Sequence, residues 1–376
     1  MKLIMEFMNN FIDTVSGVLY QPWCVPLLLL AGGIILTIRS KLMQARLFTE
    51  CFKVITEKPT TKGGISSFGA LMVSTASRVG TGNIIGVATA ICAGGAGAVF
   101  WMWITAIIGG ASAFVESTLA QIYKKRNADG TSYGGPAFYM RDALGQRWLG
   151  VLFSCLIILT YAVGYNMLAA YNLQDTFSVF GFYTKGTTPM IIGAILAVLF
   201  GVIVIGGAKR LTKSTEIMVP FMGILYVLVS LVILVLNADR LGEMFAMIFE
   251  SAFGPVFLSA AMSLFAFTTL IGNYSYCEGC LRFILNRAVS RGGILAFRSL
   301  ATLLVFVGAI ANAGTVWNLA DMTQGLMVLV NLPVILILAK PAFLCLEDYC
   351  KQKKDGKNPV FIAKDAGIDA DLDFWK

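Results

Sequence analysis

The chain has no histidine among its 376 residues. Histidine titrates closest to neutral pH and is the commonest metal ligand in proteins. Its absence therefore removes the commonest proton shuttle and the commonest ligand for a metal centre. The sequence also shows no nucleophile paired with a base and no cluster of metal-ligating side chains. We expect a protein that is not an enzyme and that carries no cofactor.

Charged residues are scarce as well. They make up 13% of the chain, against 57% hydrophobic residues, and the mean hydropathy is +0.77. Soluble domains carry roughly 25% charged residues, so the composition indicates an integral membrane protein. The apolar runs are long and do not alternate, which predicts an all-α, polytopic helical bundle and excludes an outer-membrane barrel.

The eight cysteines lie mostly in or beside apolar segments, where cysteine acts as a small apolar side chain. Cys277 and Cys280 have the CxxC spacing. A zinc site needs a second pair of ligands, and the sequence offers none. We interpret this pair as part of an ordinary helix end.

About nine stretches have the length of roughly 20 apolar residues that a membrane span needs. We place these predicted spans at 23–39, 66–93, 98–123, 148–171, 189–207, 214–236, 255–276, 294–313 and 322–346. Residues 1–22 add a short interfacial helix. Together they form a transmembrane domain over 1–350, followed by a polar cytoplasmic tail, 351–376, with no specific partner expected.

Basic residues gather in every second connection. The connections after the first, third, fifth and seventh spans and the tail are rich in lysine and arginine, whereas the alternate ones hold only Lys185 and Arg240. This is the positive-inside pattern. It predicts a multi-pass protein of the plasma (cell inner) membrane with its N-terminus outside and its C-terminus in the cytoplasm. It also explains the net charge of +8 without a nucleic-acid partner.

The second span contains residues that weaken a helix. Gly80 and Gly82 flank Thr81 and precede Asn83, and each glycine lowers helix stability by about 1 kcal/mol relative to alanine. An opened helix offers carbonyls to a cation and amides to a carboxylate, as broken helices do in secondary transporters. The alternative is a helix face of small residues for close packing.

Several longer motifs carry a family resemblance from about residue 20 to 350. They are VGTGNIIGVATAI, GGAGAVFWMW, ESTLAQIY, YGGPAFYM, GGAKRLTKSTEIMVPFM, FAFTTLIGNYSYCE and VWNLADMTQGLMVLVNL. In this order they resemble the alanine or glycine:cation symporter family, the sodium:alanine symporters. The resemblance implies a fold like that of the leucine transporter, with two inverted five-helix repeats. It also implies import of alanine or glycine with sodium or, in some members, protons.

The resemblance assigns roles to particular residues. It implies that Gly80, Thr81, Gly82 and Asn83 bind the amino acid, together with Asn166 on a helix that lines the cavity. It further implies that Val79, Thr268 and Thr269 bind the coupling sodium ion.

The sodium ligands and the outer gate each have an alternative interpretation. The hydroxyls of Thr268 and Thr269 can instead bond to the backbone of their own helix. Trp317 and Asp321, which the resemblance makes a possible outer gate, can instead be an interfacial aromatic and a helix-start acid.

Ionisable residues near or within the spans are expected to be paired or functional, since buried charge in lipid is costly. They are Arg78, Glu116, Glu216, Glu278 and Asp321. Glu116 is the expected partner of Arg78. The alternative for Arg78 is that its long side chain reaches the membrane surface.

The chain departs from the family pattern of eleven spans. It lacks two helices near 254–255, so the second repeat is incomplete and the partner of the broken helix is missing. We expect sodium-coupled symport of small neutral amino acids by alternating access. The alternatives are a non-transporting truncated member, or a subunit that needs a protein partner of unknown identity.

Overall fold

A computed structural model describes residues 2–57, 66–80, 82–94, 97–126, 132–236, 254–286 and 289–375. Nearly all of the regular structure in these residues is helical. The exception is a pair of two-residue antiparallel strands, β1 (Lys125–Arg126) and β2 (Ser132–Tyr133). The expectation of a helical membrane bundle is confirmed.

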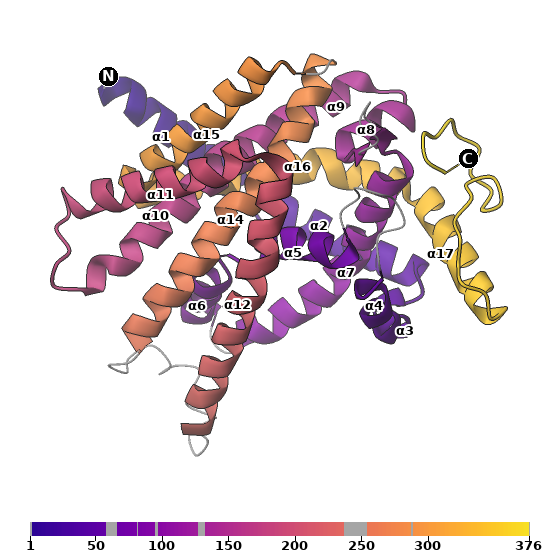
Figure 1. The fold of residues 1–376 in the computed structure, drawn as a ribbon, viewed down its shortest axis with the longest axis horizontal. Helices are drawn as coiled ribbons and strands as arrows, with labels where there is room; N and C mark the ends of the chain where they lie inside the picture. The colour runs from indigo at the N-terminus through magenta and orange to yellow at the C-terminus, as the bar shows by residue number, and fades with distance from the viewer. Residues whose placement is uncertain are drawn as a thin grey trace.

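Figure 1 shows the order and packing of the helices. They are α1 (Lys2–Leu19), α2 (Val25–Arg39), α3 (Met43–Arg46), α4 (Phe48–Ile55), α5 (Ser67–Arg78), α6 (Gly82–Gly94), α7 (Gly97–Ile122), α8 (Pro136–Asp142), α9 (Arg147–Ile157), the π-helix η1 (Ile158–Tyr165), α10 (Asn166–Asp175), the 3-10 helix η2 (Thr176–Val179), α11 (Thr188–Ile205), α12 (Gly207–Leu236), α14 (Gly254–Leu285), α15 (Arg291–Ile310), α16 (Ala313–Ile337) and α17 (Ala339–Lys354).

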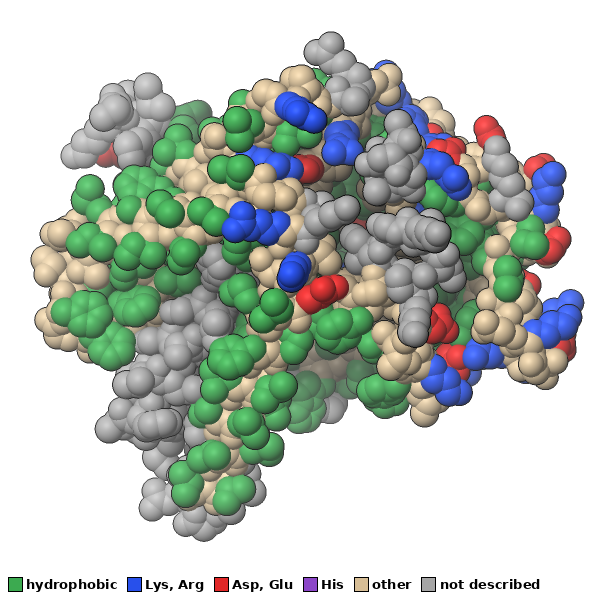
Figure 2. Space-filling model, viewed as in Figure 1, with side chains coloured by type: hydrophobic (Ala, Val, Ile, Leu, Met, Phe, Trp, Pro, Cys, Tyr) green, Lys and Arg blue, Asp and Glu red, His purple; other side chains and the backbone are tan. Residues whose placement is uncertain are grey.

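Each predicted span overlaps at least one of these helices. In the described part of the chain, six helical segments are long and apolar enough to cross a membrane, and Val25–Arg39 and Gly82–Cys92 are shorter apolar helices. The total of nine spans and the inverted repeat remain predictions. Figure 2 shows hydrophobic side chains covering α12, while charged side chains gather over α17 and the C-terminal segment.

The last predicted span, 322–346, is wrong in its boundaries. Helix α16 ends at Ile337, and α17 begins at Ala339 after a break at Leu338. Pro341 explains the break, because its ring has no N–H and clashes with the carbonyl four residues earlier, at Ile337. Residues 339–346 therefore belong to a separate helix that contacts α7.

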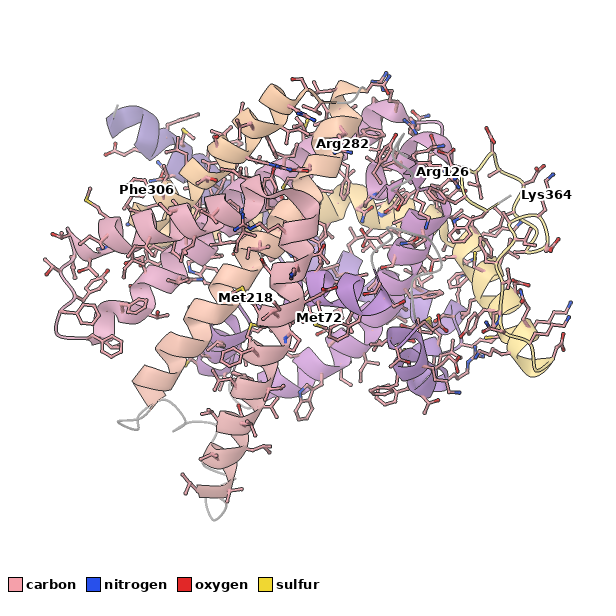
Figure 3. The ribbon with its side chains drawn as sticks, viewed as in Figure 1. Met72, Arg126, Met218, Arg282, Phe306 and Lys364 are labelled. Atoms are coloured by element: carbon pink, nitrogen blue, oxygen red, sulfur yellow. The ribbon has the colours of Figure 1, made fainter. Side chains whose placement is uncertain are left out.

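Two apolar clusters hold the bundle together. One joins α2, α7, α8, α9 and α16 with the start of α17, and includes the fully buried Leu36, Val115 and Tyr139. The other joins α10, α11, α14 and α15, and includes Phe200 and Leu270. Helices α5, α12 and α14 also pack on one another, and Figure 3 shows Met72 of α5 and Met218 of α12 in this region.

The C-terminal segment is folded onto the bundle. Ala363, Ile368 and Leu372 are buried in the first cluster. The Trp375 indole donates a hydrogen bond to the Gln121 carbonyl oxygen at the end of α7, at 2.8 Å. The expected polar tail therefore contributes apolar residues to the core.

Candidate functional site

The second predicted span is interrupted where its glycines cluster. Helix α5 ends at Arg78, Val79 is extended with φ −98° and ψ 92°, and α6 begins at Gly82. Thr81 lies outside the described residues. The non-helical segment is shorter than expected, because Gly82 and Asn83 already form the first turn of α6.

Hydrogen bonds close the break on both sides. The Val79 N–H donates to the Thr75 carbonyl oxygen at 2.8 Å, and the Asn83 N–H donates to the Gly80 carbonyl oxygen at 3.0 Å. The Asn83 side chain accepts from the Gly80 N–H at 3.3 Å. Gly80 is buried, whereas Gly82 and Asn83 are exposed. In this conformation the Asn83 side chain stabilises the break.

Gly80 lies against Thr269 of α14. A Cβ atom placed on Gly80 would overlap Thr269 Oγ1, so a larger residue here requires the Thr269 side chain or α14 to shift. Thr269 is 7% exposed, and among the described residues its Oγ1 has no hydrogen-bond partner. In this structure the Thr269 hydroxyl therefore does not form the alternative bond to the backbone of its own helix. The Thr268 side chain lies outside the described residues.

A second glycine brings α14 close to the end of α5. A Cβ on Gly272 would lie 2.5 Å from the Ser77 backbone nitrogen. The Ser77 hydroxyl donates to Asn273 Oδ1 at 2.8 Å. Asn273 is 1% exposed, and its Nδ2 has no partner within the part of the chain that the structure describes. Since Thr269 and Asn273 are four residues apart, they share one face of α14.

Ser77 and Asn273 were not among the residues predicted for the site. The signal for Asn273 was its spacing of four from Thr269 with a glycine between them, inside a motif already quoted. Ser77 had no comparable signal, because a serine within an apolar helix is common and only its contact with Asn273 distinguishes it.

These groups together offer oxygen ligands. The end of a helix leaves its last carbonyls without intrahelical partners and carries the negative end of the helix dipole. Here that end lies beside the free hydroxyl of Thr269 and the amide of Asn273. Carbonyl and hydroxyl oxygens suit a hard cation, and unwound carbonyls coordinate sodium in broken-helix transporters. The residues present therefore fit a sodium ion.

Asn166 is fully buried at the start of α10. Among the described residues, neither its Oδ1 nor its Nδ2 has a hydrogen-bond partner. The π-helix η1 immediately precedes it, and such wide turns occur often at functional sites. The Thr160 hydroxyl within η1 is buried and unpartnered in the same part of the structure. Sequence reasoning missed η1, since no residue pattern specifies a π-helix.

Trp317 and Asp321 lie on α16. Trp317 belongs to the same apolar cluster as Tyr165 and Leu168, which lie on either side of Asn166 in the sequence. The Asp321 backbone oxygen accepts from the Tyr20 hydroxyl at 3.4 Å. The structure therefore groups Trp317 with the surroundings of Asn166, and groups Gly80 with Thr269. Helix α10 contacts both α14 and α16 and so connects the two groups.

The expected ion pair between Arg78 and Glu116 is not formed among the described residues. Glu116 instead accepts a hydrogen bond from Asn331 at 2.8 Å, and Asn331 accepts one from the Tyr139 hydroxyl at 2.7 Å. Arg78 is exposed, which fits the alternative in which its side chain reaches out of the bundle. Glu278 is paired, with Arg298 of α15 at 2.7 Å.

Metal binding by acidic or cysteine clusters finds no support in the described residues, where no group of three such side chains comes together. Cys277 and Cys280 are both buried and free.

Known relatives are similar over the whole length of the chain. The model of the sodium:alanine symporter family matches residues 5–256 and 253–363. The probable sodium/glutamine symporter GlnT of Bacillus subtilis is 33% identical over 456 aligned positions, which cover 95% of this chain and 94% of the relative. The amino-acid carrier protein AlsT of the same organism is 31% identical, covering 96% of each chain.

A third relative matches a shorter region. The sodium/alanine symporter AgcS of Methanococcus maripaludis is 36% identical over 254 positions, covering 66% of this chain and 55% of the relative. The family model accounts for nearly all of the chain. This protein, a multi-pass membrane protein of apolar helices, belongs to the sodium:alanine symporter family.

Proposed function

We propose that this protein carries a small neutral amino acid, alanine or glycine, into the cell together with sodium, by alternating access. The observation that carries the proposal is the contact between the helix break at Gly80 and the unpartnered Thr269 hydroxyl. It supplies a neutral oxygen site for sodium at the end of α5. The names of the relatives support coupling of an amino acid to a cation.

The same geometry supports the choice of the residues that bind the amino acid. The N-terminal end of α6 carries the positive end of its helix dipole, which favours a carboxylate. The buried and unpartnered Asn166 side chain offers both a donor and an acceptor to the polar groups of an amino acid. Gly80, Gly82, Asn83 and Asn166 are the proposed substrate residues, with Val79 and Thr269 on the cation. Trp317 and Asp321 are the proposed outer gate.

Transport in proteoliposomes tests the proposal. Purified protein is reconstituted, and uptake of labelled alanine and glycine is measured with an inward sodium gradient, with a proton gradient, and with neither. We expect accumulation under the sodium gradient that stops when an ionophore collapses it. Uptake no greater than in empty vesicles refutes the proposal, and uptake driven by protons alone refutes sodium as the coupling ion. Competition by unlabelled glutamine, the substrate in the name of one relative, distinguishes the substrate classes.

The second candidate is a family member that does not transport alone. The family model matches in two pieces that meet at 253–256, and the 456-position alignment is longer than the chain itself. Both observations favour a missing internal segment near 254–255, where the partner of the broken helix is expected. Restoring two spans from a relative at this position tests the candidate. Uptake gained only by the restored chain supports it, and equal uptake by both chains refutes it.

A further inference from the structure

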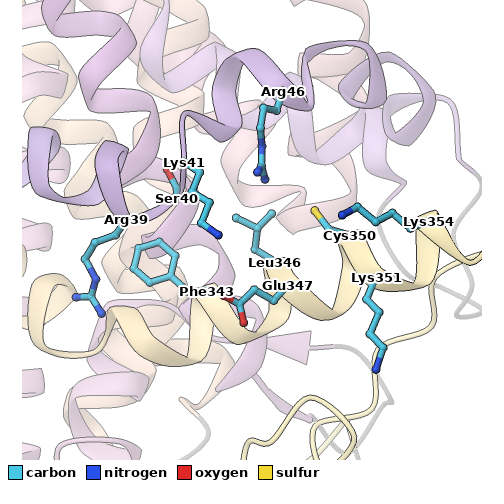
Figure 4. Close-up of a pocket in the computed structure, with 10 residues that line it drawn as sticks. All are labelled: Arg39, Ser40, Lys41, Arg46, Phe343, Leu346, Glu347, Cys350, Lys351 and Lys354. Atoms are coloured by element: carbon cyan, nitrogen blue, oxygen red, sulfur yellow. The ribbon is translucent and has the colours of Figure 1, made fainter.

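A cavity of about 320 Å³ lies between the end of α2, helix α3 and helix α17. It is far in sequence from the proposed sodium site, and its size falls within the roughly 300–1,000 Å³ of ligand pockets. Leu346 and Phe343 form an apolar part of its wall, and Lys41, Arg46 and Lys354 line it from opposing elements. Figure 4 shows Arg46 and Lys41 extending from one side and Lys354 from the other toward the space beside Leu346.

The cavity is strongly positive. Its lining contains five basic residues and one acidic residue, Glu347. None of the five forms an ion pair among the described residues, whereas the adjacent Lys353 is paired with Glu50. Like charges that face one another repel, so this arrangement is stabilised by a bound anion.

The backbone is strained at the cavity wall. Lys41 and Leu42 both adopt left-handed conformations, with φ 55° and φ 53°, and each such non-glycine residue costs roughly 1–2 kcal/mol. The Lys41 N–H donates to the Ile38 carbonyl, and the Leu42 N–H donates to the Thr37 carbonyl. This turn ends α2 sharply and presents Lys41 to the cavity. Strain of this kind persists where the surroundings stabilise it, often at binding sites.

The surroundings favour a lipid over a soluble anion. Ile38 and Leu42, on either side of Arg39, are 70% and 55% exposed. The Arg39 guanidinium lies 5.0 Å from the centre of the Phe343 ring. The basic cavity thus opens beside an apolar strip at the end of a membrane helix. Basic pockets beside membrane helices bind the head groups of anionic lipids.

We propose that the cavity between α2, α3 and α17 binds the phosphate group of an anionic membrane lipid. Arg46 and Lys354 hold the phosphate from opposite sides, Lys41 adds a third donor, and the acyl chains lie along Ile38 and Leu42. This site is separate from the proposed transport site, and its occupancy is measurable without transport.

Binding of short-chain lipids to the full-length protein in a neutral detergent tests the proposal. The probes are dihexanoyl phosphatidylglycerol, dihexanoyl phosphatidylcholine and inorganic phosphate, measured by titration calorimetry. We expect saturable binding of the glycerol lipid and at least ten-fold weaker binding of the other two. Inorganic phosphate binding as tightly as the glycerol lipid overturns the lipid assignment, and equal binding of the choline lipid overturns the role of charge.

Paired variants locate the site. In the double variant Arg46→Gln/Lys354→Gln we expect affinity for the glycerol lipid to fall at least ten-fold. The matched control Lys357→Gln/Lys364→Gln removes two exposed charges outside the cavity and should change affinity less than two-fold. The charge-preserving Arg46→Lys/Lys354→Arg should retain binding and shows that the fold tolerates change here. Equal losses in the cavity and control variants overturn the location.

Discussion

Gly80, in the break between α5 and α6, lies directly against the hydroxyl of Thr269 on α14. Any side chain at Gly80 would require Thr269 or one of the two helices to shift. The Thr269 hydroxyl at this contact has no hydrogen-bond partner among the described residues. The break between α5 and α6 and an unpartnered oxygen on α14 therefore meet at one glycine.

Replacing this glycine should disturb the site. In Gly80→Ala the new methyl group overlaps Thr269 Oγ1, and overpacking of this kind costs about 1–3 kcal/mol. We expect a lower thermal midpoint in detergent and loss of most sodium-driven uptake. Gly86→Ala is the control, because a Cβ at Gly86 meets no atom within 4 Å. Replacing this glycine by alanine should stabilise helix α6 by about 1 kcal/mol. If both variants lose stability and uptake equally, the contact does not shape the site.

The pair Glu278–Arg298 should matter for stability. Their side chains are only 19% and 15% exposed, and the Arg298 guanidinium also donates to the Ile205 carbonyl. Removing one partner of a buried pair leaves a charge uncompensated. Because the pair is only partly buried, we expect Arg298→Leu to destabilise the protein by about 1–3 kcal/mol, and Glu278→Gln/Arg298→Leu to recover part of that loss. A double variant no more stable than Arg298→Leu would contradict a direct interaction.

The end of the chain should help to hold the bundle together. Trp375 donates to the Gln121 carbonyl, and its ring lies 4.6 Å from the Lys124 ammonium. A hydrogen bond and a cation–π contact each contribute about 0.5–1.5 kcal/mol. We expect Trp375→Ala to lower the thermal midpoint and to expose the tail to protease. Trp148→Ala, at a tryptophan that is 64% exposed, should do neither.

Acid should weaken the contact between α4 and α17. Hydrogen bonds from Lys353 and Tyr349 lower the pKa of Glu50 from 4.5 to about 2. Because the folded pKa is below the unfolded one, the stabilisation is complete above about pH 4.5 and disappears as the pH falls toward 2. We expect Glu50→Gln to flatten the pH dependence of the thermal midpoint in this window. An unchanged dependence would show that Glu50 stays unpaired in solution.

The sequence predicts the break at Gly80 because glycine acts locally, through the backbone of its own helix. It also indicates where the helices lie, since a long apolar run predicts a helix that is buried in the membrane or in the protein. Thr269 required the family resemblance, because its contact with Gly80 joins residues far apart in the chain. Local patterns carry no information about such a contact.

Other features depend on packing that no local pattern records. The π-helix η1 arises within an ordinary apolar run, and the expected partner of Arg78 bonds instead to Asn331. The tail looks polar in composition, yet Ile368, Leu372 and Trp375 turn inward because the end of α7 offers them a surface. The end of α16 at Ile337 was missed although Pro341 marks it.

Binding of radioactive sodium to purified protein tests the account most directly, with Thr269→Val as the variant. This change removes the hydroxyl and keeps the shape, so the protein should fold normally. Thr302→Val is the matched control, because the Thr302 hydroxyl donates to the Arg298 carbonyl of its own helix. We predict saturable sodium binding in the wild type and in Thr302→Val, with at least ten-fold weaker binding in Thr269→Val. Equal sodium binding by all three proteins, or none by the wild type, would contradict a sodium site at the break.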